Sequence, residues 1–372
     1  MKNKKNQLNI PVYRPVLNGN EKKYVNECLD STWISSRGDF IPRFENGFSD
    51  YLNVQAATTV SNGTVALHLA LHALGVGPGD EVIVPTLTYI ASVNAIAYVG
   101  ATVVFVDSLE DTWNVDPDQV AAKITSKTKA IMIVHLYGNP CAMDQLESIC
   151  SDHDLYLIED AAEAFGSRYQ DKYVGSFGDV ATFSFFGNKT ITTGEGGMLT
   201  SNNETLIKRA AYLKSQSVSA VKEYWHNELG FNFRMTNICA AIGVAQLENI
   251  DNILQKKQKI AEWYQAGLKD IDVKFQVTEE GSVNSYWMVT ILAKNNAIRD
   301  EIRSYLELHG VETRPIFYPA HKMPAFFQDE YFPVAETLSK RGINLPSFPD
   351  LCVEDVSYIC ELIKRCLDES ML

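Results

Sequence analysis

Short apolar, strand-like runs alternate with helix-like segments between about residues 55 and 200, and this alternation limits the possible folds more than any other feature of the chain. The strand-like runs are AATTVS, EVIVP, ATVVFVD, KAIMIVHLYG and LYLIED. Strands separated by helices need crossover connections, so we predict a mainly parallel sheet with helices on both faces. Ligands of such sheets bind beyond the carboxyl ends of the strands, so the residues that follow each run are candidate site residues.

The pattern changes after Thr236. The segment over residues 236–268 has helical composition throughout, so we predict one long helix that leads from a first domain into a second. Beyond it, the strand-like run SYWMVTILA is mixed with helical segments at residues 299–308 and 353–366. A chain of 372 residues is too long for one small core. We therefore predict an N-terminal arm over residues 1–20, a large domain over residues 21–250 and a smaller α+β domain over residues 251–372.

The charge distribution argues against a nucleic-acid partner and against a membrane span. The net charge is −13 and the basic residues are scattered, whereas a nucleic-acid surface gathers Lys and Arg on one face. The basic cluster at residues 2–5 precedes no apolar run, so we interpret it as a solvated tail rather than a secretory signal. Pro85 and Gly100 interrupt the uncharged stretch between Glu81 and Asp107, and we predict a strand–helix–strand unit there instead of a membrane helix.

The cysteines and histidines indicate neither disulfides nor a metal site. The seven cysteines are odd in number and form no CxxC motif, which favours free thiols in a reducing cytoplasm. His68 and His72 are four residues apart on a predicted helix. No third ligand and no HExxH pattern accompany them, so we predict packing or solvent contact for both rings.

One lysine stands in an unusual setting, FSFFGNKTITTGEGGM at residues 183–198. A surface loop with an inert lysine is the commonest explanation of such a segment. A Walker A motif is a second, but it needs an earlier glycine and a Gly-Lys pair, and Asn188 separates Gly187 from Lys189. A third is a Schiff-base lysine, because a carbonyl cofactor needs an amine on a short turn with room beside it. The segment alone leaves these explanations open.

Polar or aromatic groups also stand at the other predicted strand ends. The turn SNGT at residues 61–64 opens a helix, where free backbone amides can bind a phosphate. Asp160 ends LYLIED, Tyr89 follows VPTLT, and Ser184 precedes Lys189 by five residues. Each has an ordinary alternative, such as a helix cap or core packing. Together with Lys189, these residues supply an amine, a carboxylate, an aromatic ring that can stack on a flat cofactor, and an anion-binding turn (the anion seat) at one sheet edge. These are the groups that pyridoxal phosphate requires.

In these motifs the chain resembles the sugar-nucleotide aminotransferases of the DegT/DnrJ/EryC1/StrS family. The resemblance extends from TWISSRG at residues 32–38 to INLPSFP at residues 343–349, and it includes VHLYGNPC, FSFFGNKTITTGEGGM and FNFRMTNICAAIG. It implies the aspartate-aminotransferase-like α/β fold of PLP-dependent enzymes of fold type I. That fold has a large domain with a mostly parallel seven-stranded sheet and a smaller C-terminal α+β domain. The resemblance also implies a homodimer with shared active sites, and it leaves open whether dimers pair further.

The resemblance implies pyridoxal 5′-phosphate as the cofactor, alternating with its pyridoxamine form. Lys189 would form the Schiff base and move the proton, and Asp160 would pair with the pyridine nitrogen. Glu163 matches the position beside the ring hydroxyl of the cofactor, where many relatives have glutamine. The remaining implied cofactor contacts are Gly63, Thr64 and Ser184 at the phosphate, Tyr89 over the ring, and Asn232 reaching to the phosphate from a second subunit.

Within the family, the chain is most similar to members that act on GDP-linked sugars. This implies amination of the C4 ketone of GDP-4-keto-6-deoxy-D-mannose, with glutamate as the donor and 2-oxoglutarate as the by-product, for an O-antigen or another cell-surface polysaccharide. The implied substrate contacts are Trp33, Arg234, Arg314, Tyr318 and His321. The alternatives are another keto-sugar nucleotide, a PLP-dependent GDP-sugar dehydratase, a PLP-binding regulator and a nucleotide-binding module. Related dehydratases have histidine where this chain has Lys189, which favours amino transfer.

Overall fold

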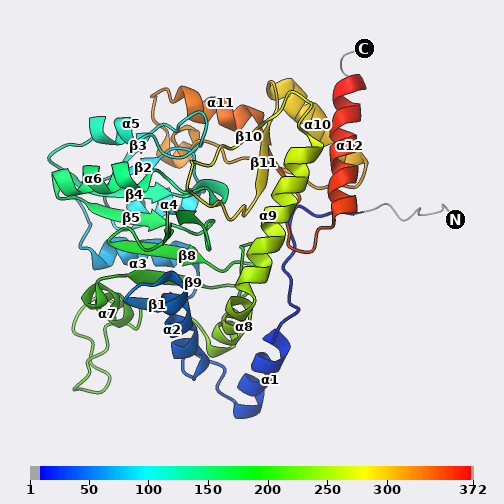
Figure 1. Cartoon of the computed structure of the whole chain (residues 1–372). Helices are drawn as coiled ribbons and strands as arrows, with labels where there is room; N and C mark the ends of the chain where they lie inside the picture. Colours follow the sequence, from blue (N-terminus) through cyan, green and yellow to red (C-terminus); the bar gives the residue numbers. More distant parts are fainter. Residues whose placement is uncertain (1–8, 370–372) are drawn as a thin grey trace.

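The computed structural model describes residues 9–369, and its largest element is a seven-stranded sheet (Figure 1). The strand order is β1-β9-β8-β5-β4-β2-β3. β9 runs antiparallel to both of its neighbours, and the other neighbouring pairs are parallel. The predicted mostly parallel sheet is therefore confirmed. The strands are β1 (Ala56–Val60), β2 (Glu81–Pro85), β3 (Thr102–Val106), β4 (Thr128–Val134), β5 (Tyr156–Asp160), β8 (Val180–Ser184) and β9 (Gly197–Ser201).

Alternate residues of the central strands face opposite sides of this sheet and contact different helices, because side chains alternate along a strand. Val82 and Val84 pack in one buried cluster with apolar residues of α3, α4 and α7, whereas Ile83 packs in another with α5 and α6. A third cluster joins the β8 and β9 end of the sheet to α1, α2 and α8. The helices are α1 (Glu21–Ser31), α2 (Phe40–Leu52), α3 (Gly63–Ala73), α4 (Ile90–Tyr98), α5 (Pro117–Ala122), α6 (Met143–His153), α7 (Glu204–Leu213) and α8 (Asn237–Glu248).

Several of these helices begin where the sequence places a capping side chain. The side chain of Asn62 accepts a hydrogen bond from Val65 N at 3.0 Å at the start of α3, and Asn203 caps α7 in the same way. Thr236 caps α8. Such caps satisfy amide groups that have no acceptor inside the helix, so they fix the residue at which each helix starts.

The predicted continuous helix over residues 236–268 is wrong, because the chain breaks it at Asn249. α8 ends at Glu248, and α9 (Ile250–Gly267) begins directly after Asn249, whose φ of −109° and ψ of 9° are not helical. α8 packs on α1 and α2, while α9 packs on α12. The first turn of α9 still packs in the cluster of α1, α2 and α8, and its later turns pack in the cluster of the C-terminal sheet, so α9 connects the two packing units (Figure 1).

The C-terminal part of the chain forms a separate four-stranded antiparallel sheet. Its order is β10-β11-β13-β12, and it shares a buried cluster with α9, α10 and α12. This arrangement agrees with the predicted α+β unit. The domain limits proposed from the sequence stay a prediction, and residues 1–8 of the predicted N-terminal arm lie outside the described residues. The elements are β10 (Lys274–Phe275), β11 (Val289–Leu292), α10 (Asn296–Leu308), β12 (Arg314–Pro315), α11 (Pro333–Arg341), β13 (Gly342–Leu345) and α12 (Val353–Glu369).

Short elements and loops complete the fold. They are a two-stranded sheet of β6 (Arg168–Tyr169) and β7 (Lys172–Tyr173), and the 3-10 turns Leu136–Gly138, Ala320–Lys322 and Pro324–Phe326. The uncharged stretch between Glu81 and Asp107 is divided among β2, α4 and β3, as predicted. Over residues 9–369, no helix combines the length and the apolar character needed to cross a bilayer.

Candidate active site

A cavity of 630 Å³ opens at the edge of the seven-stranded sheet where β1, β5 and β8 end. Because β9 runs in the opposite direction, the loop that precedes it returns to the same edge and brings Lys189 there. A cavity of this size is typical of small-molecule and cofactor sites. The predicted site residues that line it are Gly63, Thr64, Tyr89, Asp160, Glu163, Ser184, Lys189 and Arg314.

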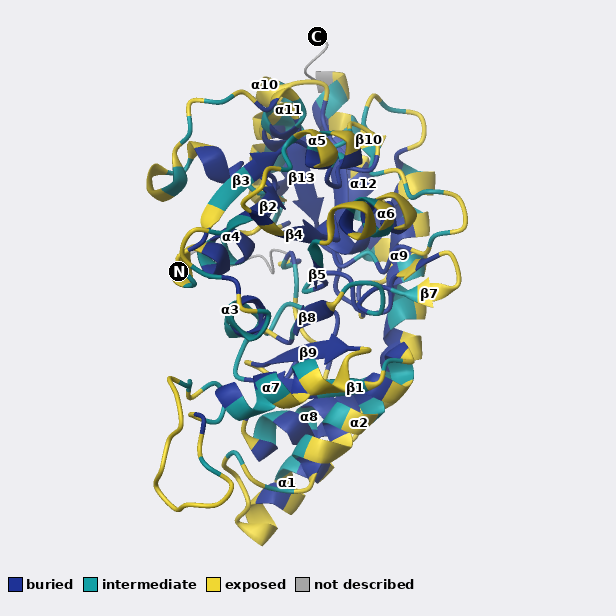
Figure 2. Ribbon diagram, turned by 90° about the vertical axis from the view of Figure 1, so that its left-hand side faces the viewer, coloured by how far each residue is buried: buried dark blue, intermediate teal, exposed yellow. Residues whose placement is uncertain are grey.

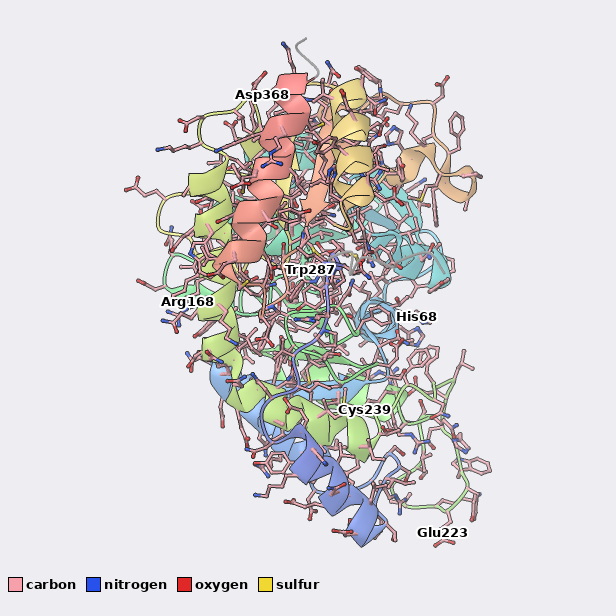
Figure 3. All side chains as sticks on the ribbon, turned by 90° about the vertical axis from the view of Figure 1, so that its right-hand side faces the viewer. His68, Arg168, Glu223, Cys239, Trp287 and Asp368 are labelled. Carbon is pink, nitrogen blue, oxygen red and sulfur yellow. The ribbon has the colours of Figure 1, made fainter. Side chains whose placement is uncertain are left out.

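The Lys189 side chain is largely buried between a carboxylate and an indole ring. Its Nζ lies 3.8 Å from Glu163 Oε1 and 4.0 Å from the centre of the Trp287 ring, and 12% of the side chain is exposed. Trp287 is itself buried, and Figure 3 labels it near the middle of the view. Burial lowers the pKa of Lys189, and the charges of Glu163 and Asp160 oppose that change. A lysine in such a setting is available as a neutral, nucleophilic amine at a lower pH than usual.

The backbone around Lys189 is held by side chains from distant parts of the chain. The Tyr13 hydroxyl donates to Lys189 O at 2.7 Å, and Trp287 Nε1 donates to Asn188 O at 2.6 Å. Lys189 N donates to Phe186 O at 2.9 Å within the loop. The lysine therefore stands on a fixed turn rather than on a loose surface loop, which removes the commonest alternative explanation of this segment.

Asp160 is a buried carboxylate that has hydrogen bonds but no counter-ion. Its Oδ2 accepts from the Ser92 hydroxyl at 2.7 Å and its Oδ1 accepts from Ala162 N at 3.1 Å. No ion pair within residues 9–369 includes it, and burial raises its pKa. A buried anion is costly without a positive partner. The site thus suits a ligand that brings a positive group to Asp160, such as a protonated ring nitrogen.

Glu163 is held at the other side of Lys189. Its Oε2 accepts a hydrogen bond from Tyr137 N at 2.9 Å. Tyr137 has a φ of 58°, a left-handed conformation that a tyrosine seldom adopts, and its hydroxyl accepts from Phe317 N at 3.1 Å. Burial raises the pKa of Glu163 to about 7, and the Lys189 charge opposes this rise. Burial thus moves the pKa of Glu163 up and the pKa of Lys189 down, toward each other.

The start of α3 has the features of the anion seat predicted from the SNGT turn. The amides of Gly63 and Thr64 lie in the first turn of α3, where they have no intrahelical acceptor, and the Ser184 side chain lies against Gly63. A Cβ on Gly63 would be 2.7 Å from Ser184 Cβ, so only glycine leaves this approach open. Amides at a helix start together with a hydroxyl group are a common phosphate site. The amine, the unpaired Asp160 carboxylate and this seat therefore fit pyridoxal phosphate.

Aromatic rings from both packing units form one wall of the cavity, with the buried Tyr137 ring behind it. The rings of Tyr89 and Phe317 are 5.7 Å apart, those of Phe317 and Tyr137 are 5.3 Å apart, and those of Tyr137 and Trp287 are 6.1 Å apart. Tyr89 is exposed at the cavity mouth. Sequence reasoning identified only Tyr89 of this wall, and it also missed Ser92. Ser92 follows Tyr89 by three residues in α4, and that spacing on one helix face was the available signal.

Three predicted site residues lie outside the cavity on one region of the surface. Trp33 O accepts from Asn237 Nδ2 at 2.7 Å, which fixes the WISSRG turn against the start of α8. Asn232 and Arg234 are exposed and bond to each other, with Arg234 NH2 donating to Asn232 Oδ1 at 3.0 Å. These side chains do not line the cavity of their own chain.

His321 and Tyr318 do not line the cavity either, and the expected substrate contact of His321 needs correction. The His321 ring is fully buried, with Nδ1 2.6 Å from Thr86 Oγ1 and the Phe332 ring centre 4.6 Å away. A side chain enclosed in this way cannot reach a sugar nucleotide without unpacking, so we assign it a packing role. Tyr318 is exposed, and its place as a substrate contact stays a prediction.

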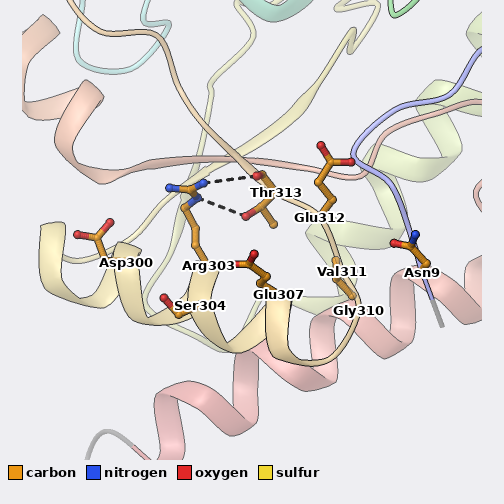
Figure 4. Close-up of a pocket in the computed structure, with 9 residues that line it drawn as sticks. All are labelled: Asn9, Asp300, Arg303, Ser304, Glu307, Gly310, Val311, Glu312 and Thr313. Atoms are coloured by element: carbon orange, nitrogen blue, oxygen red, sulfur yellow. Dashed lines mark hydrogen bonds between the residues drawn. The ribbon is translucent and has the colours of Figure 1, made fainter. Parts of the chain in front are cut away.

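Another hollow, of 530 Å³, lies between α10 and the segment that leads into β12 (Figure 4). Arg303 bonds there to Thr313, with Nε 3.3 Å from Oγ1, and Asp300, Glu307 and Glu312 also line it. None of the predicted site residues lies in this hollow. It supplies no amine near a carboxylate and no helix start, so we assign the chemistry to the sheet-edge cavity.

The histidine pair on α3 makes aromatic contacts. The His68 ring is 5.0 Å from the Phe231 ring, and the His72 ring is 5.1 Å from it. Figure 3 shows His68 on the flank of the molecule. Among the described residues, no group of three or more His, Cys, Asp or Glu side chains could hold a metal ion.

We predict that Glu163 makes the stability of the cofactor-free protein fall as pH rises through the acid-to-neutral range. The unfolded chain loses this proton near pH 4.5, whereas the folded protein holds it to about pH 7. Folding therefore binds a proton between these values, so the free energy of unfolding decreases with rising pH. In the Glu163→Gln variant this pH dependence is absent. Between pH 5 and pH 8 its free energy of unfolding should therefore rise, relative to that of the parent, by up to about 3 kcal/mol. Urea unfolding at several pH values measures the difference, and parallel curves for the two proteins would contradict it.

The family model described as the DegT/DnrJ/EryC1/StrS aminotransferase family matches residues 15–364. The chain is 57% identical to a GDP-perosamine synthase of Escherichia coli O157:H7, over 96% of this chain and 98% of the relative. It is 51% identical to a GDP-perosamine synthase of Vibrio cholerae, again over 96% of this chain and 98% of the relative. Among solved structures, a putative sugar aminotransferase Spr1654 from Streptococcus pneumoniae in its PMP form superposes with a TM-score of 0.93 at 29% identity, covering 98% of this chain and 100% of the other.

Proposed function

The chain belongs to the DegT/DnrJ/EryC1/StrS aminotransferase family, and from this premise we propose that it makes GDP-perosamine from GDP-4-keto-6-deoxy-D-mannose, with glutamate as the amino donor. The observation that carries the proposal is the cavity that brings the Lys189 amine, the Asp160 carboxylate and the α3 amides together. The choice of sugar is supported by the high identity to relatives named for this product. The product would serve a cell-surface polysaccharide such as an O-antigen.

The enzyme is PLP-dependent, as its family implies. Pyridoxal phosphate, when bound, supplies an aldehyde that exchanges amino groups and a pyridine ring that withdraws electrons. Gly63, Thr64 and Ser184 would hold its phosphate, and Tyr89 would cover its ring. Asp160 would keep a proton on the ring nitrogen, because a buried carboxylate without a counter-ion stabilises a positive group beside it.

Lys189 is the group that holds and moves a proton in the cavity. Burial favours its neutral form, and Glu163 Oε1 at 3.8 Å is the nearby group that can accept or return a proton at Nζ. The indole ring of Trp287 restricts the amine to one side of the cavity. An acid–base residue works best when its pKa lies near the working pH, and both members of this pair are shifted toward neutral pH.

Arg314 is our candidate for binding the anionic groups of the substrates. Lys189 and Arg314 are the cationic side chains among the described residues that line the cavity. Both substrates are anionic, since glutamate has carboxylates and the sugar nucleotide has a diphosphate. Arg314 is about half exposed and lies 3.5 Å from Glu312, a loose pair that leaves guanidinium donors available.

We also propose a homodimer in which each cavity is completed by the other subunit. Asn232, Arg234 and Trp33 lie outside the cavity of their own chain, which supports a role for them in the site of a partner. The loop after α7 projects from the body of the molecule, with Glu223 at its tip in Figure 3 and a mostly exposed course in Figure 2. Val221 and Tyr224 on this loop are 95% and 96% exposed, and exposed apolar groups of this kind mark contact surfaces.

A mixed dimer tests whether the sites are shared. Lys189→Ala and Asn232→Asp, which places a negative charge beside the cofactor phosphate, should each be inactive alone. In a mixed dimer of the two variants, one site contains both changes and the other contains neither. Random pairing should therefore restore about a quarter of the parental activity. If each chain forms its own site, co-expressed and separately tagged variants will stay inactive together.

The substrate assignment is tested with a panel of keto-sugar nucleotides and glutamate. We expect the amino product from the GDP-linked sugar and formation of 2-oxoglutarate in equal amount. Turnover of only a UDP- or dTDP-linked sugar would refute the GDP assignment and leave the aminotransferase assignment in place. A deoxygenated product without an amino group would indicate the dehydratase alternative. We place the enzyme in the cytoplasm, on the ground that an odd number of cysteines without a CxxC motif is typical of a reducing compartment.

A further inference from the structure

A second buried lysine contacts the backbone of the residue whose ring lies against Lys189. Lys257, on α9, is 1% exposed, and its Nζ donates to Ser347 O at 2.7 Å and to Trp287 O at 3.2 Å. No carboxylate forms an ion pair with it in the part of the chain that the structure describes. Burial alone lowers its pKa, to about 7. The amine therefore joins α9 to the backbone that precedes β11 and to the backbone that follows β13, two neighbouring strands of the four-stranded sheet.

The residues that Lys257 contacts are those that hold the reactive lysine. Trp287 accepts from Lys257 through its backbone and presents its ring to Lys189 Nζ at 4.0 Å. The same indole donates to Asn188 O. Lys257 Nζ also lies 5.2 Å from the ring centre of Tyr13, whose hydroxyl donates to Lys189 O. One side chain thus contacts both supports of the Lys189 turn.

A contribution to the stability of the fold does not by itself explain why a lysine occupies position 257. Burying an ammonium group without a carboxylate costs free energy, and apolar residues of similar shape are often equally stabilising. The chain offers a contrast in Lys214, which is also buried but lies 3.2 Å from Glu45 Oε1. Its Nζ donates to Thr58 Oγ1 at 2.7 Å and to Thr59 O at 2.6 Å, and none of these residues lines the cavity. Lys214 has the paired environment of a structural lysine, and Lys257 does not.

We propose that Lys257 is a positioning residue that acts through Trp287, holding the indole ring against Lys189 and tying the reactive turn to the four-stranded sheet. The proposal rests on Lys189 being the reactive amine of the proposed function. Lys257 fixes the backbone of Trp287, and Trp287 fixes the environment of Nζ. A small displacement of a reacting group is enough to reduce a rate strongly, so the effect should be visible in turnover as well as in the amine itself.

The Lys257→Met variant tests this, with Lys214→Met as the matched control. Methionine keeps the length of the side chain and removes its donors. We expect kcat to fall about tenfold or more with little change in KM. In protein without cofactor, the pH midpoint for labelling of Lys189 by an amine-reactive reagent should rise, because a displaced ring lets water reach the amine. Lys257→Arg, which keeps donors and charge, should recover part of both properties. Lys214→Met should lower the melting temperature without moving the Lys189 midpoint.

A double-variant experiment with Trp287 distinguishes a positioning role of Lys257 from a purely structural one. In a Trp287→Ala background, Lys257→Met should change kcat less than about threefold, because the group through which it acts is gone. An undiminished further loss in that background would overturn the proposal, as would a Lys257→Met enzyme with the parental midpoint and kcat. The labelling measurement needs no sugar nucleotide, so it remains decisive even if the parent fails to turn over the GDP-linked sugar.

Discussion

Replacing Lys189 with alanine should reduce amino transfer by about 10⁴-fold or more, because the variant lacks both the nucleophile and the proton-transfer group. The amine is buried over the Trp287 ring and 3.8 Å from Glu163, and no second amine lines the cavity among the described residues. Initial rates of amino-sugar formation with glutamate measure the loss. The absorbance of bound cofactor in the parent, followed by borohydride reduction and peptide mapping, should identify Lys189 as the attachment point.

Lys189→Arg is the matched control for this prediction. It keeps a positive charge near Glu163 but cannot condense with an aldehyde, so we expect it to be as inactive as the alanine variant. The alanine variant should fold, because removing a buried amine takes away an unfavourable desolvation. Circular dichroism of the arginine variant checks that its larger cation is accommodated beside Glu163. A borohydride label at another lysine, or an arginine variant with a rate near that of the parent, would refute the assigned role.

Replacing Asp160 with asparagine should reduce kcat by about 10²–10³-fold, the usual loss when one well-placed electrostatic group is removed. The amide has the same shape. Its oxygen can still accept from Ala162 N and its NH2 group can donate to the Ser92 hydroxyl, but it cannot balance a positive charge on a ring nitrogen. We expect the larger change in kcat and a smaller change in KM for the sugar nucleotide. Steady-state kinetics together with the visible spectrum of the bound cofactor measure both effects.

Asp107 provides the control for Asp160. It is also a buried aspartate, directly after β3, but its carboxylate accepts from Val334 N at 3.0 Å and from Ala335 N at 2.7 Å at the start of α11. Asp107→Asn should therefore lower the melting temperature and leave kcat nearly unchanged. If both asparagine variants lose activity in proportion to their loss of stability, Asp160 has no electrostatic role.

The groups that could be predicted from sequence are those whose position follows from sheet topology. Asp160 ends a strand and Gly63 opens the helix after one, so a parallel sheet brings both to the same edge whatever the loops do. The position of Lys189 does not follow from parallel topology alone, because it precedes the antiparallel strand β9; the sequence motif around it was also needed to predict its role. Arg314 could be predicted only from the family resemblance, because the sequence pattern does not show how the four-stranded sheet packs against the cavity.

The features that could not be predicted depend on packing between distant segments. Trp287 lies two residues before β11, and nothing in SYWMVTILA shows that its ring will cover Lys189. His321 stands in a motif similar to the family, but the direction of its side chain is set by Thr86 and Phe332. The break at Asn249 has neither proline nor glycine to mark it, and it follows from helix packing on two different units.

The reversed direction of β9 affects how the enzyme can vary during evolution. β8 and β9 are antiparallel neighbours, and the segment that joins them, residues 185–196, contains no helix. The connection that contains Lys189 therefore closes like a hairpin, whereas the parallel strands of the sheet are joined by crossovers. Insertions in those crossovers change the surroundings of the cavity without altering the distance from the amine to the sheet. The reactive centre can thus stay constant while the periphery adapts to different sugars.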